Sequence, residues 1–241
     1  RALLAADEEV LVPSPDYPLW TAAVNLNRGR AVHYPCPPER GFIPSPEEIE
    51  SLITKRTRAI VVINPNNPTG AVYPRHILEA IARIAEKYHL VVLADEIYDQ
   101  MTYDGAEFVP MATLVQHTLC GTLSGLSKVY RACGYRVGWA AFSGDVEHSR
   151  EYLSALELLS SLRLCSNVAG QWAVQTALGG YQSIKELIRP GGRLYESRKA
   201  IVDAVARSKY LTLTVPRGAL YAFVGVDTQR LPGFDDRRFA M

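Results

Sequence analysis

Short apolar runs separated by longer mixed segments dominate this chain. Continuous aliphatic stretches over 59–63 and 90–94 predict buried strands at 57–63 and 90–94, and shorter, partly apolar stretches predict strands over 9–12, 31–34, 119–123 and 138–142. The intervening pattern predicts helices over 19–27, 46–53, 75–89, 151–164 and 167–178. Because strand and helix alternate, we expect an α/β fold with a mostly parallel sheet flanked by helices.

The pattern changes toward the C-terminus. Residues 184–208 are expected to be helical on both sides of a break at 190–192, and strands are predicted over 211–215 and 219–223. We therefore expect a large ligand-binding domain over 1–188 and the start of a small α+β domain over 189–241. The chain begins as if within a helix and ends as if entering one. We accordingly expect a piece of a longer protein in which both domains are incomplete.

Composition excludes several classes of protein. The 241 residues are 48% hydrophobic and 21% charged, which is typical of a globular protein. A net charge of +1 gives no electrostatic basis for binding nucleic acid or an anionic membrane, and no apolar run approaches the roughly 20 residues of a membrane span. The four cysteines form no Cys-x-x-Cys pair, which favours free thiols in a reducing cytoplasm over disulfides or a metal site.

Polar side chains follow several of the predicted strands. Tyr17 lies in a proline-rich loop after the first strand, Asn67 lies in the turn-forming segment 64–70, and Asp95 directly follows five apolar residues. Ligands bind at the carboxyl ends of strands in open α/β sheets. Each residue also has an ordinary interpretation: a tyrosine packed on prolines, an asparagine that caps a helix, and a carboxylate in a salt bridge.

One lysine and one arginine add to this set. Lys128 lies in a run of small residues, and Arg136 follows eight positions later. A desolvated lysine can form a Schiff base with a carbonyl, and the planar guanidinium group suits a phosphate. Tyr98, three residues after Asp95, could donate its hydroxyl to the same ligand. The alternative is a solvated lysine beside a surface arginine.

A single ligand would use all of these groups. The set is Tyr17, Asn67, Asp95, Tyr98, Lys128 and Arg136. Pyridoxal phosphate carries an aldehyde for a lysine, a ring nitrogen for an acid, a phenolic oxygen and a phosphate. An acid that keeps the ring nitrogen protonated makes the ring an electron sink. The hypothesis requires that Lys128 and Asp95 lie close together.

The sequence also resembles the class I/II aminotransferases of the fold-type I pyridoxal-phosphate group over nearly its whole length. The motifs that carry the resemblance are Asn-Asn-Pro-Thr-Gly at 66–70, Ala-Asp-Glu-Ile-Tyr at 94–98, Ser-Lys at 127–128 and Gly-Tyr-Arg-Val-Gly-Trp at 134–139. Within that group, segments 16–20, 163–168 and 191–196 are most similar to bacterial glutamate–pyruvate (alanine) aminotransferases.

The resemblance implies a role for each candidate. Lys128 would carry the cofactor as a Schiff base and move a proton between the substrate Cα and the cofactor C4′. Asp95 would pair with the ring nitrogen, Asn67 and Tyr98 would donate to the phenolic oxygen, Tyr17 would stack on the ring, and Arg136 would bind the phosphate. Many relatives carry a serine three positions before the lysine, where this chain has Gly125; Ser127 is the remaining candidate for a phosphate ligand.

The implied activity is transamination between an amino acid, alanine or glutamate, and a 2-oxo acid in a homodimer with Asn167 and its neighbours at the interface. The arginine that binds the substrate carboxylate is expected after Met241, and a phosphate-binding turn before Arg1. We therefore expect this chain alone to bind cofactor poorly or to turn over slowly. Two alternatives remain open: a carbon–sulfur β-lyase, which uses the same lysine and acid, and a cofactor-sensing domain of a transcriptional regulator.

Overall fold

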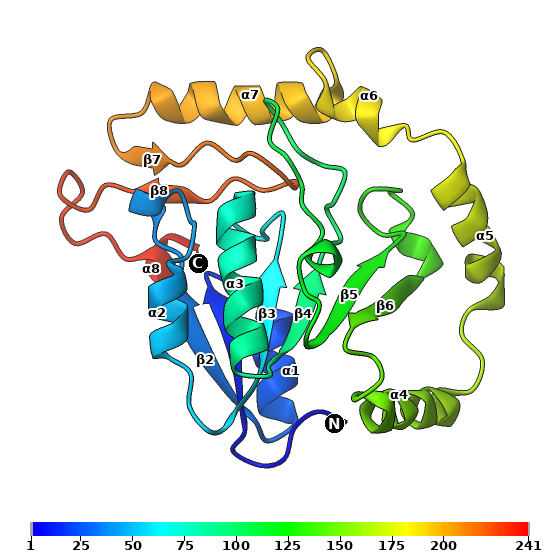
Figure 1. Cartoon of the computed structure of the whole chain (residues 1–241). Coiled ribbons are helices and arrows are strands. Elements are labelled where there is room, and N and C mark those ends of the chain that lie inside the picture. Colours follow the sequence, from blue (N-terminus) through cyan, green and yellow to red (C-terminus); the bar gives the residue numbers. More distant parts are fainter. Residues whose placement is uncertain (1, 241) are drawn as a thin grey trace.

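The computed structural model of the protein describes residues 2–240. Its centre is a six-stranded sheet with the strand order β2-β1-β3-β4-β5-β6 (Figure 1). The first five strands of this order run parallel, and β6 is antiparallel to β5. The strands are β1 (Glu9–Ser14), β2 (Arg30–Pro35), β3 (Thr57–Ile63), β4 (Val91–Asp95), β5 (Leu119–Gly125) and β6 (Gly138–Gly144). The expected α/β fold with a mostly parallel sheet is therefore confirmed.

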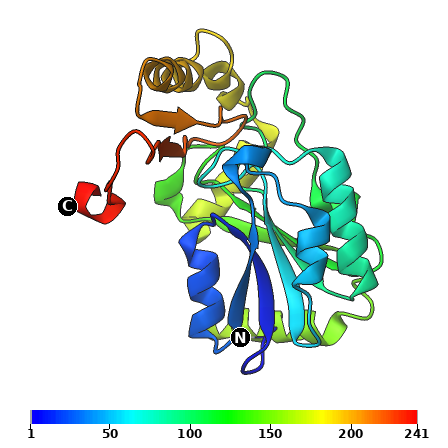
Figure 2. The same ribbon diagram turned by 90° about the vertical axis from the view of Figure 1, so that its left-hand side faces the viewer.

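Helices cover both faces of this sheet. Figure 2 shows α1 on one face and α2 and α3 on the other. The predicted helices are present, including the break in the C-terminal one, which begins at Arg189. The helices are α1 (Pro18–Leu26), α2 (Pro46–Ser51), α3 (Arg75–Lys87), α4 (Arg150–Arg163), α5 (Val168–Gly179), α6 (Ile184–Ile188), α7 (Arg193–Ala206) and α8 (Asp236–Ala240). The expected boundary between residues 188 and 189 falls between α6 and α7.

The continuous apolar run of β3 is explained by burial on both faces. Ala59, Val61 and Ile63 pack in the cluster beneath α1, whereas Ile60 and Val62 belong to the larger cluster beneath α2 and α3. Successive side chains of a strand point to opposite faces, so a strand covered on both sides has no polar face. Burial of each large aliphatic side chain contributes about 1.5–3 kcal/mol to folding.

The first strand is longer than predicted. The sequence predicts a strand over 9–12, but β1 continues through Pro13 to Ser14. A proline removes one ladder hydrogen bond because it has no N–H. Pairing of β1 with β3 runs only from Glu9 to Leu11, so at Pro13 the strand pairs with β2 alone. Pro13 is therefore tolerated where the strand has one neighbour.

The C-terminal segment forms a second, two-stranded antiparallel sheet from β7 (Leu211–Leu213) and β8 (Val224–Val226). The strand predicted over 219–223 is wrong, because β8 begins only at Val224. The backbone before it is bonded to the large sheet's loops instead: the N–H of Ala219 donates to Met101 O at 2.9 Å, and Gly218 forms an isolated bridge with Thr102. These contacts hold the segment against the ends of the main strands.

Two helices are largely uncovered. None of the residues of α4 is buried, and in α5 only Gly170 is. Leu158, Leu162 and Trp172 expose 65%, 75% and 78% of their surface. Both helices lie on the β6 side of the molecule (Figure 1).

Within residues 2–240, no helix combines the length and the apolar character that a membrane crossing needs. The four cysteines also lie within residues 2–240 and are free thiols; Cys36 and Cys120 are buried, whereas Cys133 and Cys165 are exposed.

Candidate active site

One edge of the sheet carries Asn67, Asp95 and Lys128. Asp95 ends β4, and the other two residues lie in the loops that follow β3 and β5. Because the three strands are parallel, the loops that follow them meet at that edge. A pocket of about 440 Å³ opens there, within the range of small-molecule sites. All seven residues singled out from the sequence line it: Tyr17, Asn67, Asp95, Tyr98, Ser127, Lys128 and Arg136. The required proximity of Lys128 and Asp95 is thus met within a single pocket.

Asp95 is the last residue of β4 and is half-buried. Burial raises the pKa of its carboxyl group. The hydrogen bond from the indole N–H of Trp20 at 3.0 Å, the backbone N–H of Ile97 and the charge of Lys128 each lower that pKa and so limit the rise. The carboxyl group is therefore held by two donors and a nearby cation.

Lys128 lies in the loop that connects β5 to β6. This loop is closed by backbone bonds from Leu126 N to Val137 O at 3.0 Å and from Ala132 N to Leu126 O at 2.9 Å. The side chain is half-buried, and its Nζ lies 5.9 Å from the centre of the Tyr98 ring. The amine therefore lies near the Tyr98 ring, and both residues line the pocket.

The three asparagines of the 64–70 loop have different environments. Asn64 and Asn66 are buried: Asn64 Oδ1 accepts from Tyr73 N at 2.9 Å, and Asn66 Oδ1 accepts from the amide and the hydroxyl of Thr69 at 3.1 and 2.7 Å. Asn67 is half-buried and lines the pocket. Two amides therefore shape the loop, and the third is available to a ligand.

The phosphate-binding candidates surround the end of β5. Arg136 is exposed, has a left-handed backbone with φ 52°, and donates from Nη1 to Cys133 O at 2.5 Å. Ser124 and Ser127 line the pocket on both sides of Gly125. A Cβ at Gly125 would lie 2.8 Å from Val137 O, so the close approach of β6 explains the glycine. The hydroxyls next to this position remain within the pocket.

Sequence reasoning missed two residues that bond to the predicted ones. Trp20 donates to Asp95, and the hydroxyl of Tyr221 lies 2.6 Å from that of Tyr98. Trp20 lies one helical turn after Tyr17, a spacing that could have signalled a shared direction. No local signal marks Tyr221, which reaches the pocket from a segment 123 residues distant in sequence. Ser124 and Cys133, which also line the pocket, were likewise not selected.

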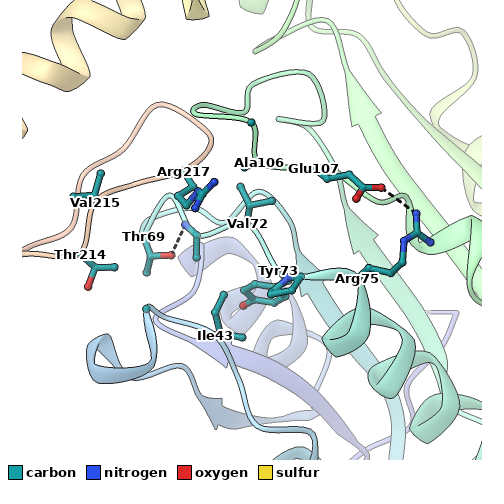
Figure 3. A pocket seen from close by; sticks show the side chains of 14 residues that line it. Ile43, Thr69, Val72, Tyr73, Arg75, Ala106, Glu107, Thr214, Val215 and Arg217 are labelled. Carbon is teal, nitrogen blue, oxygen red and sulfur yellow. Dashed lines mark hydrogen bonds and ion pairs between the residues drawn. The ribbon is translucent and has the colours of Figure 1, made fainter.

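A second pocket of about 480 Å³ lies beside the 64–70 loop, between the large sheet and residues 214–217 (Figure 3). It contains none of the seven predicted residues. Its polar side chains bond to other protein groups: Arg75 bonds Glu107 at 3.1 Å, the hydroxyl of Thr69 donates to Asn66 and accepts from Ala71 N, and Arg217 donates to Asp104 O at 3.1 Å. The reactive groups are therefore concentrated in the first pocket.

A comparison with protein families decides the assignment. The family described as "Aminotransferase class I and II" matches residues 1–239.

The chain belongs to the class I and II aminotransferase family.

Individual relatives agree with this assignment. Glutamate-pyruvate aminotransferase AlaA from Escherichia coli K12 is 49% identical over 241 residues, which are 100% of this chain and 60% of that protein. Alanine aminotransferase from Mycobacterium tuberculosis H37Rv is 46% identical over 241 residues, 100% of this chain and 56% of that protein. The chain therefore spans about 60% of the length of the curated relatives it matches.

Solved structures of aminotransferases share the fold. An aminotransferase from Escherichia coli superposes with a TM-score of 0.96 at 50% identity, covering 99% of this chain and 59% of that one. Alanine aminotransferase from Pyrococcus furiosus superposes with a TM-score of 0.89 at 38% identity, covering 93% and 56%.

The residues in the pocket fit the cofactor used by class I and II aminotransferases. Pyridoxal phosphate requires an amine, an acid for its ring nitrogen, donors for its phenolic oxygen and a cation for its phosphate. Lys128, Asp95, Tyr98 with Asn67, and Arg136 supply these four kinds of group around one cavity. An aromatic ring, that of Tyr17, completes the lining.

Proposed function

We propose that the protein is a pyridoxal-phosphate-dependent aminotransferase that acts through Lys128. The presence of all seven candidate residues in the lining of one pocket carries this proposal. They come from five separate parts of the chain, and they include an amine and a carboxyl group on the same cavity. Membership of the aminotransferase family supports the same activity.

Each residue has a task in this proposal. The cofactor supplies an electron sink that stabilises negative charge at the substrate Cα. Lys128 would hold the cofactor through its amine and would move a proton between the substrate Cα and the cofactor C4′. Asp95 keeps a proton on the ring nitrogen.

The remaining residues would orient the ring. Asn67 and Tyr98 donate to its phenolic oxygen, and the ring of Tyr17 packs on its face. Arg136 binds the phosphate, with Ser127 as an additional donor. The half-buried position of Lys128 and Asp95 limits access of water to the two reacting groups.

The proposed substrates are alanine or glutamate as amino donor and a 2-oxo acid as acceptor. The support comes from the relatives, which are named glutamate-pyruvate and alanine aminotransferases and are 46–49% identical. Product analysis with alanine plus 2-oxoglutarate, compared with a cysteine conjugate, separates this activity from carbon–sulfur β-elimination. Formation of glutamate and pyruvate from the first pair is the expected result.

A spectroscopic titration tests the role of Lys128. Addition of pyridoxal phosphate to the protein is expected to produce the absorption band of a cofactor bound covalently to a lysine, and Lys128→Ala is expected to lose it. Lys55→Ala, which removes an exposed lysine remote from the pocket, is the control and should keep the band. Borohydride reduction followed by peptide mass analysis should locate the cofactor on Lys128. A band of equal strength in Lys128→Ala would exclude Lys128 as the attachment point.

We also propose that two copies associate through the face formed by α4 and α5. Leu158, Leu162 and Trp172 expose large apolar surfaces there, and such surfaces are typical of protein interfaces. Asn167 caps the N-terminus of α5 and donates from Nδ2 to Tyr135 O at 2.8 Å, which connects this face to the loop that carries Arg136. Sedimentation analysis should show a dimer that Leu158→Glu dissociates.

A further inference from the structure

Trp20 connects α1 to the acid of the candidate site. It is the third residue of α1, and its indole packs beside the cluster formed by Val10, Val12 and Ile63. Its Nε1–H donates to Asp95 Oδ2 at 3.0 Å, although 75 residues separate the two in sequence. The aromatic body is therefore held by the core, while the polar tip reaches the pocket.

The start of α1 is anchored on both sides of Trp20. Pro18 occupies the first turn, where its missing N–H costs nothing. The hydroxyl of Thr21 donates to Asp16 Oδ2 at 2.6 Å and lies 2.9 Å from Nε2 of His33 on β2. The Trp20 amide donates to Tyr17 O at 3.0 Å. These contacts fix the direction in which the indole points.

The environment of Asp95 makes this donor important. The pocket wall around it includes the aliphatic side chains of Ile63, Ile97 and Leu123, which disfavour a charged carboxylate. An indole N–H can only donate, so its bond is strongest to the ionised acid. The other charged or titratable groups near Asp95 are Lys128, Glu96 and Tyr98.

We propose that Trp20 is a positioning residue, whose indole N–H fixes the Asp95 carboxylate and favours its ionised form for pairing with a protonated ring nitrogen. The inference rests on the proposed function for its cofactor, but the hydrogen bond itself belongs to the protein alone. Trp20 acts through Asp95 and needs no contact with substrate. Its effect should therefore vanish when Asp95 cannot ionise.

The first test requires no cofactor. In the proton–nitrogen spectrum of the protein, the three tryptophans give three indole signals, and Trp20→Phe identifies that of Trp20. We expect this signal to lie downfield, to shift as the Asp95 carboxyl group is protonated, and to move upfield in Asp95→Ala. The signals of Trp139 and Trp172 should show neither the pH dependence nor the upfield move in Asp95→Ala. A Trp20 signal that is independent of pH and unchanged in Asp95→Ala overturns the proposal.

The second test measures cofactor binding. Trp20→Phe keeps the aromatic packing and removes the donor, and it should weaken the affinity for pyridoxal phosphate about tenfold, as expected for loss of a hydrogen bond to a charged group. Trp139→Phe, which alters another half-buried indole outside the pocket, should leave the affinity unchanged. In an Asp95→Asn background, Trp20→Phe should have no further effect. Equal weakening in both backgrounds would mean that Trp20 contributes by packing alone and overturns the proposal.

The two tests separate failure of this inference from failure of the proposed function. If Lys128→Ala keeps a cofactor band as strong as that of the parent protein while the Trp20 signal still follows Asp95, the proposed function through Lys128 is wrong and the hydrogen bond is real. If the band forms and Trp20→Phe binds like the parent protein, the proposed function stands and the role of Trp20 is refuted.

Discussion

The hydroxyl groups of Tyr98 and Tyr221 lie 2.6 Å apart, and their rings meet edge to face with centres 5.7 Å apart. Tyr98 follows β4, whereas Tyr221 belongs to the segment between β7 and β8. The pair therefore joins the C-terminal segment to the wall of the candidate active site. Any shift of that segment would change the partner of a residue proposed to bind the cofactor.

Replacement of Tyr221 by phenylalanine should release the Tyr98 hydroxyl while keeping the ring contact. Loss of one hydrogen bond is expected to lower the free energy of unfolding by about 1 kcal/mol. Burial, followed by the bond to Tyr221, raises the pKa of Tyr98, so Tyr98 should ionise at a lower pH in Tyr221→Phe. Carbon-13 spectra of labelled tyrosine can follow this ionisation. Tyr210→Phe, at an exposed tyrosine, is the control; an unchanged Tyr98 titration in Tyr221→Phe would contradict the prediction.

The neighbouring asparagines Asn66 and Asn67 provide a matched pair. Asn66→Ala leaves the buried amide and hydroxyl of Thr69 without their acceptor and should cost about 1–3 kcal/mol of unfolding free energy. Asn67→Ala should leave stability almost unchanged and weaken pyridoxal-phosphate binding instead. Chemical denaturation and a cofactor titration of both variants measure the two effects. The reverse result, with Asn67 as the stabilising residue, would refute this division of roles.

Gly70 should be intolerant of any side chain. Its φ is +71°, and an added Cβ would lie 2.4 Å from Pro216 Cβ and 2.9 Å from Tyr221 O. Its carbonyl accepts from both Arg217 N and Gly218 N at 2.8 Å, so Gly70 also anchors the C-terminal segment. Gly70→Ala should lower the unfolding free energy by about 2–4 kcal/mol, from left-handed strain plus overpacking.

The control for Gly70 is Gly105, which has nearly the same backbone conformation. Its φ is +72°, but no atom lies within 4 Å of an added Cβ. Gly105→Ala should therefore cost only the conformational strain, about 1–2 kcal/mol. Thermal or denaturant unfolding compares the two variants directly. If they lose equal stability, the contact with the C-terminal segment contributes nothing.

Glu96 should make folding stability depend on pH. Its side chain is buried, Oε1 accepts from Met111 N at 2.8 Å, and burial raises its pKa from 4.5 to about 7. Between these values the folded protein holds a proton that the unfolded chain releases. Stability should therefore fall as the pH rises through this window, by on the order of 2–3 kcal/mol.

Glu96→Gln tests this dependence because glutamine keeps the acceptor and removes the titration. The variant should flatten most of the slope between pH 5 and pH 7, and it should be more stable than the parent protein at about pH 8. Burial also raises the pKa of Asp95 and Asp99, so a smaller slope of the same sign should remain. Glu151→Gln, on the exposed face of α4, should leave the slope as it is. Denaturation curves at several pH values decide the question.

The sequence by itself determined the fold class and most of the candidate site. Aliphatic runs identify buried strands, and the carboxyl ends of parallel strands share one edge, so the sequence alone predicts that Asn67 and Asp95 lie at the same edge. The small residues around Lys128 marked the third loop at the same edge. These inferences depend on local pattern and a general rule of topology.

Tertiary structure alone decided the partners of these residues. Trp20 bonds Asp95 and Tyr221 bonds Tyr98 across 75 and 123 residues, and no local periodicity encodes such contacts. The same limit explains the error over 219–223: its apolar pattern suits a strand, but the backbone N–H of Ala219 donates to Met101 O, and the N–H groups of Arg217 and Gly218 just before it donate to Gly70 O. Local sequence favours an element, whereas the neighbours brought by the folded chain determine which hydrogen bonds that element makes.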